Sequence, residues 1–188
     1  MSVQKRYAGR SDVPLTEVGV GQAAAAAKRL ASAGIGVIVT SPLLRAARTA
    51  QAVAEVTGVP VLTEEGFRET DFGAWEGLTF AEVRERWPAE MTAWLADPAV
   101  APPGGESLAE VGVRVTEALH RVLAGRDRQT ILIVSHVTPI KTLVAAALLA
   151  PPAAMYRMHL DVAALCEIDW YADGPAVLRS FNDTGHLT

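Results

Sequence analysis

Apolar residues occur along the chain in two patterns, short continuous runs and longer stretches with helical spacing. The runs at 35–40 (IGVIVT), 59–63 (VPVLT) and 130–135 (TILIVS) predict strands. The third run is apolar on both faces, which predicts a central, parallel strand. Pro60 has no N–H for a ladder, so the second strand is expected at an edge or early in the sheet.

Helices are predicted between and after these runs. The clearest follows Ser107, and its apolar residues recur every three or four positions: Leu108, Val111, Val115, Leu119 and Val122. Ser107 with Glu110, and Thr79 with Glu82, match the capping box that begins a helix. Other helices are expected to begin near four residues that favour a cap or a first turn: Thr16, Pro42, Pro88 and Pro139.

The C-terminal segment predicts a hairpin. The stretches 164–171 (ALCEIDWY) and 176–182 (AVLRSFN) are separated by the turn residues Asp173 and Gly174. The whole alternation predicts one α/β domain over residues 1–188. We expect a three-layer α/β/α sandwich with a mostly parallel central sheet and an antiparallel C-terminal edge hairpin.

Composition narrows the function classes. The chain of 188 residues carries 17 basic and 21 acidic residues, a net charge of −4, without the Lys and Arg cluster that nucleic-acid binding needs. A single cysteine, Cys166, excludes an internal disulfide and favours a cytoplasmic protein. One Cys and four scattered His give no zinc-ligand spacing. No apolar stretch has the length of a signal peptide or a membrane span, so we expect no membrane partner.

Two residues follow predicted parallel strands where ligands usually bind. Arg45 lies in the first turn after the strand 35–40, and His136 ends the strand 130–135. The carboxyl ends of parallel strands meet at one edge, where helix N-termini offer N–H groups to an anion. This pair therefore predicts a phosphate pocket. The alternatives at this point are a surface arginine, as we expect for Arg48, and a buried histidine with a structural hydrogen bond.

The loop 67–77 (FRETDFGAWEG) concentrates three carboxylates, Glu69, Asp71 and Glu76. A carboxyl group beside a phosphate can act as a general acid toward a leaving alcohol. The alternative for this loop is an ordinary acidic surface. The three other histidines, His120, His159 and His186, lie in no such setting, and we expect no catalytic role for them.

Taken in order, six stretches resemble the histidine phosphatase superfamily, the phosphoglycerate mutase-like group. They are GxxDxPLTxxGxxQA (9–23), SPLLRAARTA (41–50), RETDFGAWEG (68–77), GGES (104–107), VSH (134–136) and FNDTGHL (181–187). Within the group, YAGRSDVPLT and FGAWEG look most like alpha-ribazole phosphatase-like enzymes. SHVTPIK looks like the phosphatase half of actinobacterial fusions with ribonuclease H.

The resemblance implies a two-step phosphoryl transfer through a phosphohistidine, without a metal or an organic cofactor. By match, Arg45 is a phosphate clamp, His136 is the second histidine, Glu69 is the proton donor, and Gly9 belongs to the substrate-contacting loop. The substrate would be a small phosphorylated molecule, with an alpha-ribazole phosphate-like ester as one candidate. Glu76 and, more weakly, Asp71 stay open as alternative acids.

The chain departs from the family at its start. The superfamily carries its attacking histidine in an Arg-His-Gly triplet directly after a first, central strand, and neither is found in this sequence. We therefore expect an N-terminally incomplete domain that lacks its first central strand. Its true start would lie upstream, in a longer gene model or in a fusion with another domain. Val137, Thr138 and Pro139 also replace the glycine that usually follows the second histidine.

These observations favour a phosphomonoester hydrolase of the acid phosphatase type in the full-length protein, with the chain as given inactive. A phosphoglycerate mutase-like enzyme is the enzymatic alternative. It is disfavoured by the few basic residues in the segment between FGAWEG and GGES. The non-enzymatic alternative is a pseudophosphatase that binds a phosphorylated ligand or a partner through Arg45 and His136.

Overall fold

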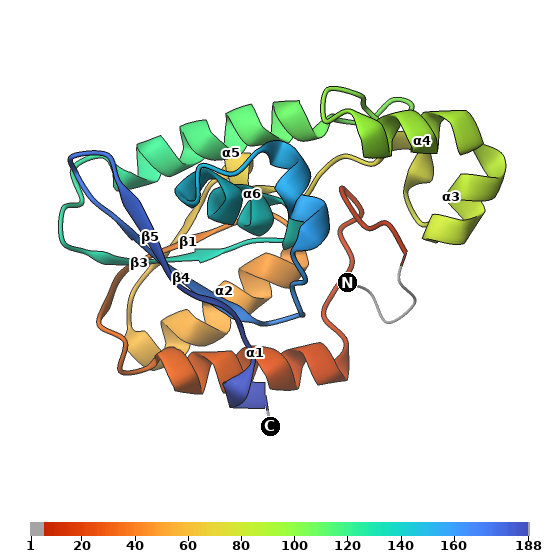
Figure 1. The fold of residues 1–188 in the computed structure, drawn as a ribbon. Coiled ribbons are helices and arrows are strands. Elements are labelled where there is room, and N and C mark those ends of the chain that lie inside the picture. Colours follow the sequence, from red (N-terminus) through yellow and green to blue (C-terminus); the bar gives the residue numbers. More distant parts are fainter. Residues whose placement is uncertain (1–5, 188) are drawn as a thin grey trace.

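A three-stranded parallel sheet lies inside the computed structural model, which describes residues 6–187 (Figure 1). Its strands are β1 (Ile35–Thr40), β2 (Val61–Thr63) and β3 (Thr130–Val134), in the order β2-β1-β3. Thr40 of β1 pairs with Thr63 of β2 and with Val134 of β3. This register brings the carboxyl ends of all three strands to one edge of the sheet.

Two layers of helices cover the sheet (Figure 1). On one face lie α1 (Glu17–Leu30) and α2 (Leu44–Thr57), and on the other lie α5 (Leu108–Leu123) and α6 (Val137–Ala147). Ile131 and Ile133 pack on the α5 side of β3, whereas Leu132 and Val134 pack on the α2 side. The predicted three-layer α/β/α arrangement is confirmed.

A smaller group of elements lies at the N-terminal end of α5 (Figure 1). It comprises the short helices α3 (Phe80–Arg86) and α4 (Pro88–Ala96), preceded by the 3-10 turns η1 (Glu65–Phe67) and η2 (Gly73–Trp75). Aromatic rings hold this group together: Trp75 packs edge-on against Trp94 with ring centres 5.5 Å apart. Tyr7 packs on the other side of Trp75, at 6.0 Å. Both predicted capping boxes, at the starts of α3 and α5, are present with both of their hydrogen bonds.

The predicted C-terminal hairpin is confirmed as β4 (Leu165–Trp170) and β5 (Ala176–Asp183), which pair antiparallel. Within residues 6–187, this hairpin forms a sheet of its own, and β3 pairs with β1 alone. β1, not β3, is therefore the middle strand of the described sheet. β3 is apolar on both faces because a helix layer packs against each face, and the described residues place no strand along its outer edge. The 3-10 turns η3 (Pro152–Arg157) and η4 (Gly185–Leu187) complete the chain.

Two predicted helix starts are wrong by two residues. Pro42 lies before α2, whose N-cap is Leu43, and Pro139 lies inside the first turn of α6, whose N-cap is His136. A proline is tolerated anywhere in a first turn because those N–H groups have no intrahelical acceptor. His136 therefore stands at the junction of β3 and α6 rather than in a loop before the helix.

Candidate functional site at the carboxyl ends of β1 and β3

His136 and Ser41 meet where β3 and β1 end. The Nε2 atom of His136 lies 2.7 Å from Ser41 Oγ, and only 8% of His136 and 0% of Ser41 are exposed. Burial, followed by the positive charges of Arg45 and Arg114, lowers the pKa of His136 to about 3. The imidazole is therefore neutral at physiological pH and offers a phosphate a hydrogen bond rather than a charge.

Glu69 lies beside this histidine at the start of α6. One carboxylate oxygen accepts the N–H of Thr70 at 2.8 Å, and the other faces the N–H of Thr138 at 3.4 Å. Thr138 belongs to the first turn of α6, where free N–H groups favour an anion. The side chain is buried, with 8% exposure. The predicted acid and the predicted second histidine thus lie at the same helix N-terminus.

Arg45 joins the site from the first turn of α2. Its guanidinium donates to three backbone oxygens of the preceding loop, Ser11 (2.9 Å), Ala8 (3.0 Å) and Gly9 (3.1 Å). An arginine has five N–H donors, so two have no partner among the described residues. Burial lowers the pKa of Arg45, while the carboxylate of Glu69 is the largest influence that raises it. Arg45 is thus electrostatically coupled to both Glu69 and His136.

The other two acids of the loop have structural partners. Glu76 accepts the N–H groups of Gly9 (3.0 Å), Arg10 (3.1 Å) and Phe72 (3.3 Å). Asp71 accepts the N–H of Gly73 and forms an ion pair with Arg10 at 3.0 Å. Of the three carboxylates, Glu69 is the one that lies against the start of α6.

Gly9 permits a close backbone approach. A Cβ atom at this position would collide with the Thr70 carbonyl oxygen and with the Glu76 carboxylate. The Gly9 N–H donates to Glu76 and its carbonyl accepts from Arg45. The glycine therefore fixes the loop against the site, and direct contact of Gly9 with a substrate stays a prediction.

The sequence patterns missed three residues of this site, Ser41, Arg114 and Lys141. Ser41 directly follows a buried strand, a signal that could have marked it. Arg114 falls between the apolar positions of α5, where a charged residue is expected to face solvent. Lys141 lies about one turn after Thr138 on α6, and burial lowers its pKa while Glu69 opposes that shift.

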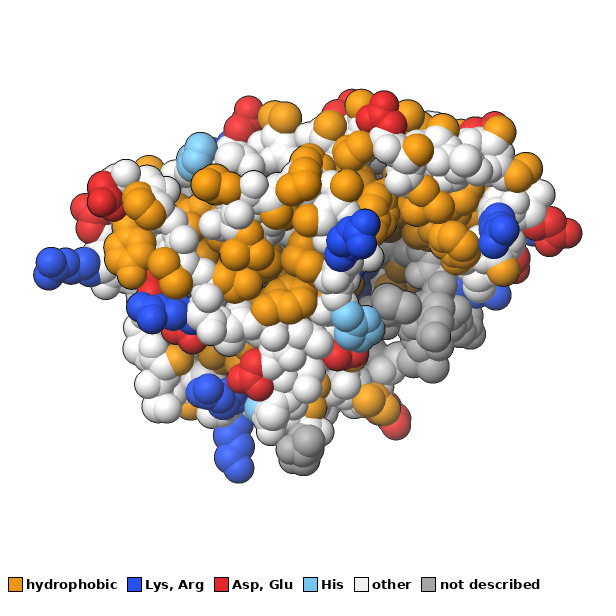
Figure 2. Space-filling model, in the orientation of Figure 1, with side chains coloured by type: hydrophobic (Ala, Val, Ile, Leu, Met, Phe, Trp, Pro, Cys, Tyr) orange, Lys and Arg blue, Asp and Glu red, His pale blue; other side chains and the backbone are white. Residues whose placement is uncertain are grey.

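The remaining histidines lie elsewhere, as predicted. His159 contacts Asp161 at 3.0 Å on the surface, and His186 lies 3.0 Å from the carbonyl of Ala163. His120 lines an apolar groove of about 590 Å³ between α5 and α6. Arg45, Glu69 and His136 are not among the residues that line this groove. Apolar side chains gather on the same face over α6 and η3 (Figure 2).

Two further findings concern residues 6–187. No group of three or more His, Cys, Asp or Glu side chains is placed to hold a metal ion. The helices of this part of the chain are all too short or too polar to cross a bilayer.

Comparisons with known proteins place this geometry in a family. Residues 1–184 match the model of the histidine phosphatase superfamily (branch 1). The bifunctional protein Rv2228c of Mycobacterium tuberculosis is 47% identical over 188 residues, which is 100% of this chain and 52% of that protein. The chain thus spans about half the length of the first curated relatives it matches.

Two other likenesses cover most of both chains. A probable phosphoglycerate mutase GpmB of Proteus mirabilis is 33% identical, over 100% of this chain and 89% of the relative. The crystal structure of the alpha-ribazole phosphatase from Shigella flexneri superposes with a TM-score of 0.86 at 28% identity. It covers 96% of this chain and 90% of that one.

Proposed function

The chain belongs to the histidine phosphatase superfamily, and on that premise we propose that it forms the phosphate-holding and proton-donating part of a phosphomonoester hydrolase. One observation carries the proposal: Arg45, Glu69 and His136, which come from three distant segments, converge at the carboxyl ends of β1 and β3. Arg45 supplies a permanent charge, His136 a neutral hydrogen-bonding ring, and Glu69 a carboxyl group.

In the family's two-step reaction, a histidine nitrogen attacks phosphorus. An N–P bond forms and the ester P–O bond breaks, while Glu69 gives its proton to the leaving oxygen. Water then attacks phosphorus, the N–P bond breaks, and the water proton returns to the Glu69 carboxylate. Arg45 and His136 would stabilise the oxygens of the transferring phosphoryl group in both steps.

The choice of Glu69 over Glu76 is supported by their partners. Glu76 accepts three backbone N–H groups, which tie it to the loop. Glu69 lies at the start of α6, next to His136. A bound phosphate dianion there would repel the carboxylate and favour its protonation, as a general acid requires.

We propose further that the attacking histidine comes from outside the 188 residues. The sequence contains no Arg-His-Gly triplet, and its four histidines are accounted for at other positions. Among residues 6–187, no strand pairs with the outer edge of β3, which supports an additional strand upstream of Met1 in a longer polypeptide. The chain alone would then hold phosphate without the covalent step. Its cytoplasmic location and a fused domain stay predictions.

The test compares the 188-residue chain with a polypeptide extended in frame upstream of Met1. We expect the shorter chain to bind inorganic phosphate, measured by calorimetry, and to lose that binding in Arg45→Gln and His136→Ala. Arg48→Gln, an exposed change on the same helix, is the control. The extended polypeptide should hydrolyse p-nitrophenyl phosphate and carry an acid-labile phosphohistidine. Phosphohistidine in the shorter chain, or an upstream stop codon without the strand and triplet, would contradict the proposal.

A phosphoglycerate mutase-like activity is the second candidate, because the probable phosphoglycerate mutase GpmB of Proteus mirabilis is 33% identical. Between residues 78 and 106, only Arg84 and Arg86 are basic, which supports a hydrolase over an enzyme that must hold a carboxylated second phosphoester. Interconversion of phosphoglycerates by the extended polypeptide, without release of phosphate, would favour the mutase. Binding without turnover in both polypeptides would favour a non-catalytic phosphate-binding protein.

For the leaving group, an alpha-ribazole phosphate-like ester is supported by the likeness to the Shigella flexneri enzyme. Tyr7 packs against Phe72 and the fully buried Trp75, both of which belong to the loop that carries Glu69 and Glu76. Tyr7 and Phe72 are only partly buried, and their rings suit contact with the aromatic base of such an ester. Comparing hydrolysis of a ribonucleoside 5'-monophosphate with that of ribose 5-phosphate by the extended polypeptide tests this preference.

A further inference from the structure

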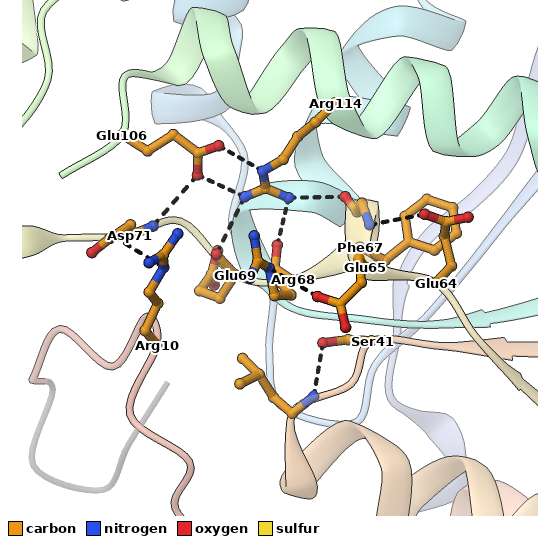
Figure 3. A network of polar contacts seen from close by, with 12 residues as sticks. Arg10, Ser41, Glu64, Glu65, Phe67, Arg68, Glu69, Asp71, Glu106 and Arg114 are labelled. Carbon is orange, nitrogen blue, oxygen red and sulfur yellow. Dashed lines mark hydrogen bonds and ion pairs between the residues drawn. The ribbon is translucent and has the colours of Figure 1, made fainter.

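Arg114 projects from the middle of α5 to the segment that carries Glu69 (Figure 3). Its guanidinium donates to the backbone oxygens of Gly66 (2.8 Å), Arg68 (2.8 Å) and Glu69 (3.2 Å). A planar fork with five donors can bind several oxygens at fixed angles, which an ammonium group cannot do. The Arg114 side chain thus fixes the backbone of residues 66–69, which leads up to and includes Glu69.

Glu106 fixes both Arg114 and the backbone after Glu69. Its two carboxylate oxygens accept from Nε and Nη2 of Arg114 at 2.6 and 2.8 Å. The backbone N–H of Glu106 donates to the Asp71 carbonyl at 2.9 Å, and its carboxylate lies 3.5 Å from the Asp71 N–H. The side chains of Arg114 and Glu106 are 18% and 20% exposed, so solvent screens this ion pair less than a surface pair.

A glycine brings the two backbones together at this point. A Cβ atom at Gly105 would collide with the carbonyl of Asp71 and come within 3.0 Å of the Gly73 nitrogen. The loop before α5 therefore packs directly on the segment that follows Glu69. Residues 66–71 are held from both sides by α5 and by the loop that leads into it.

We propose that Arg114 and Glu106 are positioning residues for the Glu69 carboxyl group. This rests on the proposed role of Glu69 as the proton donor. The pair holds the backbone before, at and after Glu69, and so aims the carboxylate at the Thr138 N–H at the start of α6. Glu69 gains a fixed place beside His136 although the segment that carries it has little regular structure of its own.

Arg114 has a second effect that can be separated from the first. Its charge contributes to the low pKa of His136, after burial and Arg45. A lysine at position 114 would keep most of that charge but lose the fork. The charge and the hydrogen-bonding geometry of Arg114 can therefore be tested independently.

The test uses NMR on the ligand-free 188-residue chain, with hydrogen exchange of the Thr138 amide as the reporter of Glu69. In Arg114→Lys, we expect Thr138 protection to fall roughly tenfold or more relative to Ile38 in β1, since charge-assisted bonds are lost. The pKa of His136 should stay low. In Arg114→Met, the same loss should be accompanied by a rise in the His136 pKa. Glu106→Gln should give a smaller loss of protection.

Arg121→Met is the matched control. Arg121 also lies on α5 and bonds Glu64 at the start of the same segment, at 2.9 Å, but it contacts no backbone near Glu69. We expect neither reporter to change. Unchanged Thr138 protection in Arg114→Lys, or failure of both position-114 variants and Glu106→Gln to fold, would overturn the positioning role. No outcome here depends on phosphate binding, so failure of the proposed function would be seen separately.

Discussion

The two outer strands of the parallel sheet, β2 and β3, flank the same neighbour but differ in length, composition and surroundings. β2 has three residues, follows Pro60, and leaves Leu62 46% exposed. β3 has five residues, and those after Thr130 are apolar and only partly buried. β2 has the features of a natural sheet edge, which is short and has few apolar contacts to lose. β3 has the composition of an interior strand.

The difference shows that strand position and strand composition are separate properties. The apolar side chains of β3 pack against the helix layers on its two faces. Its backbone N–H and C=O groups, in contrast, need a neighbouring strand as a hydrogen-bond partner. The described residues supply the layers on both faces but a strand partner on one side only. The same strand ends in His136, so the open edge lies next to the candidate site.

The largest expected effect is the loss of stability when a charge is placed on β3, compared with the same change on β2. Ile133→Asp on β3 should lower the free energy of unfolding by about 3–5 kcal/mol, because it places an unpaired charge among the apolar residues under α5. Leu62→Asp on β2 should cost about 0.5 kcal/mol or less. Urea denaturation measures both. Equal losses would show that β2 is not an ordinary edge and would remove the contrast.

The residue at the end of β3 gives a pH-dependent effect. The pKa of His136 is about 3 in the folded chain and about 6.5 when unfolded. The unfolded state therefore binds the proton first, and stability is lost as pH falls from about 6.5 toward 3. Between neutral pH and pH 4.5, this loss amounts to about 3 kcal/mol, from about two pKa units.

His136→Gln removes this titration. Between pH 7 and 4.5, the free energy of unfolding of this variant should fall by about 3 kcal/mol less than that of the unchanged chain. Denaturation curves at the two pH values measure the difference. Both proteins carry the same carboxylates, so the difference between their pH dependences reports the histidine. An identical pH dependence in the two proteins would show that His136 is not held neutral by burial.

The smallest effect concerns the contact between the ends of β1 and β3. Ser41 Oγ accepts the Leu43 N–H at 3.3 Å, so its own proton is available to His136 Nε2. We expect the neutral ring to carry its proton on Nδ1, detectable by ¹⁵N NMR. Ser41→Ala should lower the free energy of unfolding by about 1–2 kcal/mol and let the proton of His136 move between Nδ1 and Nε2. Ser41→Thr should keep the proton on Nδ1. A ring protonated on Nε2 in the unchanged chain would be inconsistent with this arrangement.

Much of this architecture could be predicted because local signals sufficed. The capping boxes at Ser107 and Thr79, the hairpin turn at Gly174 and the apolar runs each depend on neighbours in the sequence. Arg45, Glu69 and His136 were found because each lies at a strand end or in a matched motif. The backbone oxygens that Arg114 binds, in contrast, lie more than 40 residues away, and no local pattern encodes such contacts. The order of the strands was likewise set by long-range pairing rather than by composition.

The close backbone contact at Gly105 has a consequence for protein redesign. The segment between Gly73 and Gly105, with α3 and α4, leaves the sheet and its helices and returns to them where two backbones touch. Its two ends are joined by the hydrogen bond from the Ala74 N–H to the Pro103 carbonyl, at 2.9 Å. We therefore expect that segments of other lengths can be grafted there without loss of the sheet, provided that an indole fills the place of Trp94 against Trp75.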